Sequence, residues 1–230
     1  MHNSDAIIVG SGPAGVSAAR ELLASGKRVL MLDAASIPEP QELFDRDTTL
    51  APATTADASP KLRTPFARAI MQGFSDSIIT EDFTAVGARA AGGLSRIWGA
   101  GLGHFSAEDF SGWPISQEDL QPHVARTLEW MGLHEDAPLM PLDGNHTLLL
   151  SRARQRKERG MWLSRAKNAV LTQNTGSRRG CNQSGLCLWG CKRGAIWHAG
   201  MALSELKEHP AFEYRPGVVV RNLSRAGEGW

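Results

Sequence analysis

The sequence predicts an α/β fold in which helices connect the strands of a parallel sheet. Three observations support this prediction: an apolar run at residues 6–9, a glycine-rich turn with a helical pattern directly after it, and a second apolar run that ends in an acid at residue 33. Hydrophobic residues make up 42% and charged residues 21% of the 230 residues. This ordinary globular composition excludes a wholly disordered or fibrous chain.

The first strand, turn and helix are expected to follow one another without a gap. Residues 6–9 read Ala-Ile-Ile-Val, as in a buried parallel strand. Residues 10–15 read Gly-Ser-Gly-Pro-Ala-Gly, and a helix is expected over residues 13–25 because proline suits the first helical turn. Residues 27–32 predict the second strand, and Asp33 stands at its end.

Each part of this turn has a physical role in holding a dinucleotide. Gly10 permits the tight turn, Gly12 lets the backbone approach a pyrophosphate, and Gly15 lets helix and strand pack closely. The helix N-terminus offers N–H groups and a positive dipole end to the phosphates, and Asp33 can accept a hydrogen bond from a ribose hydroxyl. The pattern indicates a Rossmann-like cradle for NAD or FAD without separating the two. Its predicted binding residues are Gly10, Gly12, Pro13, Ala14, Gly15 and Asp33.

Residues 87–103 form a second glycine-rich segment, which would let the backbone approach a ligand closely. The alternative is a flexible loop. The apolar side chains of Leu94, Ile97 and Trp98 argue against this alternative, because a solvated linker would not need them.

A helix is predicted after residues 113–116, which read Trp-Pro-Ile-Ser. Ser116 suits the N-cap position, and acidic residues in the following turn suit the positive end of the helix dipole. Gly132 is expected to end this helix after about Met131.

Together these segments resemble the glucose–methanol–choline (GMC) family of FAD-dependent oxidoreductases. The details are most similar to the branch of pyranose oxidases and bacterial sugar dehydrogenases, in which a glycine pair is followed by a small residue and then a tryptophan. The resemblance covers most of the chain, with a poor match over residues 36–83. It is carried by residues 10–15, Asp33, Gly92-Gly93-Leu94-Ser95, Trp98-Gly99, residues 113–123 and the cysteine segment described below.

The resemblance implies a Rossmann-like FAD-binding fold over residues 1–230, with residues 111–175 as a mainly helical insertion and the substrate domain largely absent. The implied reaction oxidises a CH–OH group, expected on a sugar or polyol, by hydride transfer to flavin N5. FAD is expected to be non-covalent, because Ile97 stands where some pyranose oxidases carry a flavin-linking histidine. The further cofactor contacts implied are Gly92, Gly93, Ser95 and Trp98 beside the flavin and Val220 beside the adenine.

The end of the chain predicts a strand at residues 217–223 and a turn at 226–229, with no partner strand after them. The family's catalytic histidine lies in its second half, so the resemblance implies a catalytic base beyond Trp230. We expect a fragment, a split enzyme or a truncated product. One alternative is a non-catalytic FAD-binding subunit that is active only with a partner chain. Another is a nicotinamide-dependent dehydrogenase, against which the loop at residues 92–98 argues.

Three cysteines, Cys181, Cys187 and Cys191, lie within eleven residues and are surrounded by glycines. Three thiolates so close in sequence could hold an iron–sulfur cluster. The segment is also similar to that of flavin-dependent glucose and fructose dehydrogenases, which implies a [3Fe-4S] cluster. The rival interpretation is a structural loop near the flavin domain, and a zinc site is a third, with His198 as its fourth ligand.

Charge and hydropathy limit the partners. The formal net charge of +1 argues against a nucleic-acid binder, and no run approaches the 18 or so apolar residues of a transmembrane helix. A cytoplasmic location is expected. The expected partners are a small alcohol or sugar substrate and an electron-acceptor or complementing protein. The basic residues of 151–167 predict a solvated helix face or a docking surface for an acidic acceptor.

Overall fold

The computed structural model describes residues 4–36, 63–71, 81–82, 85–103, 105–134, 136–155, 163, 165–185, 187 and 191–224. The chain divides into two compact units. Unit 1 comprises Met1–Trp98, Ser184–Cys191 and His198–Trp230, and unit 2 comprises Gly99–Gln183 and Lys192–Trp197.

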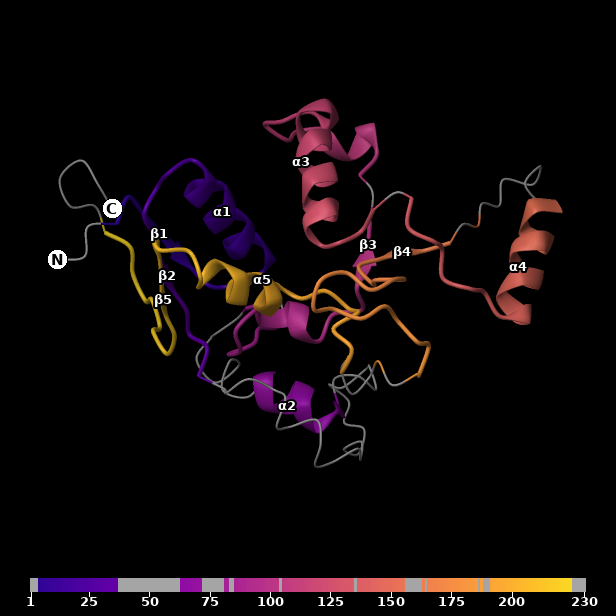
Figure 1. Cartoon of the computed structure of the whole chain (residues 1–230). Coiled ribbons are helices and arrows are strands. Elements are labelled where there is room, and N and C mark those ends of the chain that lie inside the picture. The colour runs from indigo at the N-terminus through magenta and orange to yellow at the C-terminus, as the bar shows by residue number, and fades with distance from the viewer. Residues whose placement is uncertain are drawn as a thin grey trace. The chain divides into compact units, whose positions relative to one another are not determined.

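Unit 1 is built on a parallel three-stranded sheet in the order β1-β2-β5. The strands are β1 (Ala6–Val9), β2 (Val29–Leu32) and β5 (Phe212–Arg215). Helix α1 (Pro13–Ala24) connects β1 to β2 and packs on both, and α5 (Ala199–Leu206) packs on α1 (Figure 1). The α/β fold with a parallel sheet that the sequence predicts is therefore present in unit 1.

The core of unit 1 lies between α1 and one face of the sheet. Ala6 pairs with Val29 and Val29 with Phe212, so alternate residues of the three strands share this face. Met31 of β2 is fully buried, and so are Val16 and Ala19 of α1, which packs on this strand. The helix of residues 13–25 and the strand of residues 6–9 are thus confirmed.

The strand expected at residues 217–223 is wrong: these residues contain no strand, and β5 lies earlier, at Phe212–Arg215. Pro216 has no N–H to donate to a ladder, and Gly217 has a φ of +73°. The chain therefore leaves the sheet at this point. The Gly217 and Val218 N–H groups donate instead to the carbonyls of Ala35 and Asp33, at 2.9 and 2.8 Å.

Unit 1 also contains two short helical elements, α2 (Pro65–Met71) and the 3-10 helix η4 (Gly93–Arg96). Ala67 and Ile70 of α2 form a small buried cluster with Ala90 and Ile97. The segments before and after η4 are held by this apolar contact, so residues 87–98 do not behave as a solvated linker.

Unit 2 contains α3 (Gln117–Trp130), α4 (Gly144–Gln155), the 3-10 helix η5 (Ala107–Phe110) and an antiparallel pair, β3 (Gly101–Leu102) with β4 (Lys167–Asn168). The predicted cap of α3 is confirmed. The Ser116 hydroxyl accepts from the Asp119 N–H, and the Asp119 carboxylate accepts from the Ser116 N–H. Gly132, at φ +80°, follows the helix as expected.

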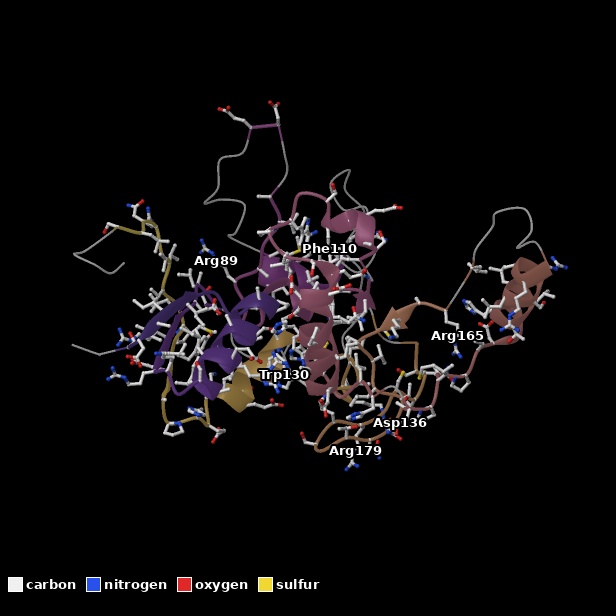
Figure 2. The ribbon with its side chains drawn as sticks, turned by 90° about the horizontal axis from the view of Figure 1, so that it is seen from above. Arg89, Phe110, Trp130, Asp136, Arg165 and Arg179 are labelled. Atoms are coloured by element: carbon white, nitrogen blue, oxygen red, sulfur yellow. The ribbon has the colours of Figure 1, made fainter. Side chains whose placement is uncertain are left out.

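Arg178 joins the segments of unit 2 through backbone carbonyls. Its guanidinium donates to the Met131 carbonyl at 2.6 Å and to the Gly194 carbonyl at 2.9 Å. Trp130, labelled in Figure 2, meets Trp197 edge to face with centroids 5.9 Å apart. The bonds that Arg178 donates therefore hold these segments of unit 2 together, which is a structural role.

The described part of the basic segment agrees with a solvated face, because Arg152 and Arg154 of α4 are exposed. Residues 156–162 and 164 of that segment, and the turn expected at 226–229, lie outside the described residues. The longest described helix, α3, has 14 residues, and none of the described helices combines the length and apolarity needed to cross a bilayer.

Candidate functional site

The glycine turn between β1 and α1 lies at the carboxyl end of the parallel sheet, where such sheets bind ligands. Gly10 has a φ of +90°, a conformation that favours glycine, and its N–H donates to the Leu32 carbonyl at 2.8 Å. Gly12 is the extended N-cap of α1 and has no side-chain cap of its own. Pro13 and Ala14, both exposed, begin the helix. The turn thus fixes the start of α1 against the end of β2.

Gly15 allows the closest contact of the turn. A β-carbon added to Gly15 would lie 2.0 Å from the Gly10 carbonyl oxygen and 3.4 Å from Cγ2 of Ile8. No side chain can be placed there without moving the backbone. The helix can lie close to the strand only because this position has no side chain.

The open side of the same turn lies at Gly10 and Gly12. A β-carbon at either residue would meet nothing within 4 Å. The first-turn N–H groups of a helix have no intrahelical acceptor, and the helix dipole favours negative charge at this end. Open space beside these donors is what a pyrophosphate requires, so the turn fits the phosphates of a dinucleotide.

Asp33 is buried at the end of β2, and backbone groups hold its carboxylate. Oδ2 accepts from the Ser11 N–H at 3.0 Å and Oδ1 from the Ala35 N–H at 2.9 Å. The Tyr214 hydroxyl also donates to Oδ2, at 3.3 Å. A carboxylate has about four lone-pair directions, so Asp33 retains acceptor capacity for a ribose hydroxyl.

The second glycine segment lies against the first. The Gly92 N–H donates to the Ser11 hydroxyl oxygen at 2.9 Å, and a β-carbon on Gly93 would lie 3.6 Å from Cα of Gly12. Gly92 has a φ of +89°, and a β-carbon there would lie 2.4 Å from the Gly200 nitrogen. The two predicted binding segments and the start of α5 therefore converge in unit 1.

Ser95 is buried, and its hydroxyl makes two hydrogen bonds within the protein. Its hydroxyl donates to the Gly92 carbonyl at 2.6 Å and accepts from the Ala199 N–H at 2.9 Å. The sequence suggested Ser95 as a flavin-side contact. In the structure it fastens η4 to the start of α5.

The remaining predicted contacts differ in exposure. Ile97, which the sequence did not suggest as a contact, is buried in the apolar cluster with Ala67 and Ile70. Trp98 is half-buried. Val220 is also half-buried and follows the two residues that bond to the backbone of Asp33 and Ala35. Figure 2 shows the described side chains of these segments as sticks.

The cysteine segment is not assembled as a metal centre in the described residues. Cys181 belongs to unit 2, whereas Cys187 and Cys191 belong to unit 1, and all three thiols are free. Across the described ranges no group of three or more His, Cys, Asp or Glu side chains is placed to hold a metal ion. The sulfur of Cys181 accepts the Gln183 N–H at 3.3 Å. The predicted iron–sulfur cluster therefore has no support here, and the same holds for the zinc alternative.

Sequence reasoning missed four residues that shape this site: Ser11, Arg96, Gly200 and Tyr214. Arg96 Nη1 lies 3.2 Å from Nδ1 of His198, beside Gly200. Ser11 occupies a position that the glycine pattern leaves unspecified, and the others come from distant segments. The signal available was the Ala-Gly pair at 199–200, the first two residues of an apolar helix, because small residues permit a close backbone approach.

Comparison with known proteins gives an independent indication of the cofactor. Residues 3–54 match the family model described as FAD binding domain, a stretch that includes β1, α1 and β2. A search of curated protein sequences gave no match. The family match and the open glycine turn together support an FAD-binding domain at the start of the chain, with FAD as the dinucleotide that it holds.

Proposed function

We propose that the chain is the FAD-binding part of a GMC-type oxidoreductase that oxidises a CH–OH group, on a sugar or polyol. The observation that carries this proposal is the contact of the second glycine segment with the first, made by the Gly92 N–H on Ser11 and by Gly93 beside Gly12. A simple dinucleotide cradle needs only the first segment. A second backbone-only surface beside it fits a cofactor that extends beyond its ADP half.

The residues of the chain would hold FAD in parts. The turn at residues 10–15 would bind the pyrophosphate, and Asp33 would accept a ribose hydroxyl. Gly92, Gly93, Ser95 and Trp98 would lie along the flavin, and Val220 would lie by the adenine. The bound flavin supplies the redox chemistry by accepting a hydride at N5. The burial of Ile97 in an apolar cluster supports a non-covalent flavin.

A second candidate is an FAD-binding module that works only with a complementing polypeptide. One observation favours it: β1 is an edge strand of the described sheet, and its residues Ile7 and Val9 are 56% and 54% exposed. An exposed apolar edge strand has unpaired backbone N–H and C=O groups, which can pair with a strand of another chain. On this proposal the catalytic base and the substrate pocket come from the partner.

The decisive experiment combines identification of the cofactor with turnover. The purified protein is expected to release FAD on heating, identified by chromatography, or to take up added FAD with a change in flavin fluorescence. Anaerobic addition of a panel of sugars and polyols should then bleach the flavin absorbance with at least one of them. FAD binding without any bleaching would favour the complementing-chain candidate. Absence of FAD binding would contradict both.

An iron assay on the same sample tests the cysteines. We propose a structural role for Cys181, Cys187 and Cys191, because the described part of the segment is held by backbone bonds such as Cys181 N–H to Leu171 carbonyl at 2.8 Å. The expected result is no iron. About three irons per chain with a broad visible shoulder would instead establish the cluster.

A further inference from the structure

We propose that Tyr214 is a positioning residue that directs the Asp33 carboxylate toward the ribose of the bound nucleotide. The inference rests on the proposed binding of FAD and names a determinant of its ADP half. It starts from the hydrogen bond of the Tyr214 hydroxyl to Oδ2 of Asp33, between residues that are 181 positions apart in the sequence.

The sheet register places these two side chains together. Tyr214 pairs with Met31 across the β2–β5 ladder. Side chains alternate along a strand, so Asp33, two residues after Met31, lies on the same face as Met31 and Tyr214. Diagonal neighbours on one face are within reach of an aromatic side chain. The Tyr214 ring therefore lies along the strand with its hydroxyl at the carboxyl end of the sheet, where nucleotides bind.

The hydrogen bonds then distinguish the two carboxylate oxygens. Oδ2 accepts from the Ser11 N–H at 3.0 Å and from the Tyr214 hydroxyl, which fills both of its lone-pair directions. Oδ1 accepts from the Ala35 N–H at 2.9 Å, which fills one. Within the described residues, the remaining direction belongs to Oδ1. Tyr214 thus leaves Oδ1 as the oxygen that accepts the ribose hydroxyl.

A second element holds the tyrosine in place. Nζ of Lys207, at the end of α5, lies 4.7 Å from the centre of the Tyr214 ring, within cation–π range. The ring is supported from α5 while its hydroxyl is engaged by β2. The side chain therefore has a defined position before any nucleotide binds.

The first test measures the affinity of the full chain for ADP and for 2′,3′-dideoxy-ADP, which lacks the ribose hydroxyls. Tyr214→Phe removes only the hydroxyl and is expected to weaken ADP binding about tenfold, since bonds to charged groups are among the stronger ones. The same change should leave the affinity for the dideoxy nucleotide nearly unaltered. Glu213→Gln is the matched control: it lies on the same strand, on the opposite face, beside Arg215. This control should leave both affinities unchanged.

The second test needs no variant, because Tyr214 is the only tyrosine of the chain. Incorporated fluorotyrosine gives a single ¹⁹F resonance, which ADP is expected to shift more than dideoxy-ADP does. Equal shifts with both nucleotides would overturn the inference. So would a Tyr214→Phe variant that is as stable as the wild type and loses the same affinity for both nucleotides, or for neither. Failure of the wild type to bind either nucleotide or FAD would instead contradict the proposed function.

Discussion

The two glycine-rich segments of unit 1 use glycine in different ways. In the first, Gly15 makes room for a carbonyl only five residues earlier in the chain. In the second, Gly92 makes room for the backbone of Gly200, more than one hundred residues later. The first segment is therefore shaped by local folding of strand, turn and helix. The second takes its shape from packing against a helix from a distant part of the chain.

The largest expected effect is at Gly15. Gly15→Ala places a β-carbon 2.0 Å from a backbone oxygen, so we expect a loss of about 3 kcal/mol in the free energy of unfolding and the loss of FAD binding. Denaturant unfolding and FAD titration measure the two effects. A variant with wild-type stability would contradict the close packing of α1 on the turn.

Gly12→Ala is the matched control. Its φ of −64° and ψ of 176° suit alanine, and the added carbon meets no atom of the protein within 4 Å. Stability should change by less than about 0.5 kcal/mol, as at open sites. FAD affinity should nevertheless fall about tenfold, because the methyl group occupies the space proposed for the pyrophosphate. Unaltered FAD affinity would show that the pyrophosphate does not approach Gly12.

Gly92→Ala tests the second segment. Alanine would be strained at φ +89°, and its β-carbon would meet the Gly200 nitrogen at 2.4 Å, so we expect a cost of about 2 kcal/mol. The control Gly99→Ala meets nothing within 4 Å and should be nearly neutral. Equal stabilities of the two variants in thermal unfolding would contradict the contact between η4 and α5.

Ser95→Ala removes a hydrogen bond from the same contact without adding volume. The Ala199 N–H would lose its acceptor in a buried position, at a cost of about 1–2 kcal/mol. Ser95→Thr keeps the hydroxyl and serves as the comparison. If Ser95 also contacts the flavin, the alanine variant should alter the flavin spectrum as well as the stability.

The smallest expected effect is at the other end of the sheet, away from both glycine segments. The Arg28 side chain and N–H hold the pKa of the Asp5 carboxyl well below its ordinary value. A lowered pKa in the folded state stabilises the fold above the ordinary value of 3.8, and this stabilisation is lost as the pH falls through the lowered pKa. Thermal unfolding in acid should therefore be less pH-dependent in Asp5→Asn than in the wild type. Identical pH profiles would contradict this pairing.

The elements that the sequence predicted correctly are those with local signals. The strand at residues 6–9, the helices α1 and α3 and the Ser116 cap depend on apolar periodicity, proline and capping residues within a few positions. These signals lie within the segment itself and do not depend on contacts with distant parts of the chain. The same locality explains why the roles expected of Gly10 and Gly15 agree with their backbone geometry.

The strand at the end of the chain was predicted wrongly for the opposite reason. The run Val218-Val219-Val220 has strong β propensity, but β5 is chosen by its register against β2, which places Phe212 beside Val29. Propensity cannot identify the partner of a strand. The contact of Tyr214 with Asp33 was missed because it depends on that same pairing.

The capping of α5 by Ser95 has a consequence for electrostatics. Two helices of unit 1 begin beside the glycine segments, and each carries a partial positive charge at its N-terminus. At α5 the first N–H is already directed at a serine oxygen, and the third, that of Met201, at the His198 carbonyl. At α1 the N-cap carries no such oxygen. Of these two described helix ends, the start of α1 is therefore the one with its first-turn N–H groups more open to an anion.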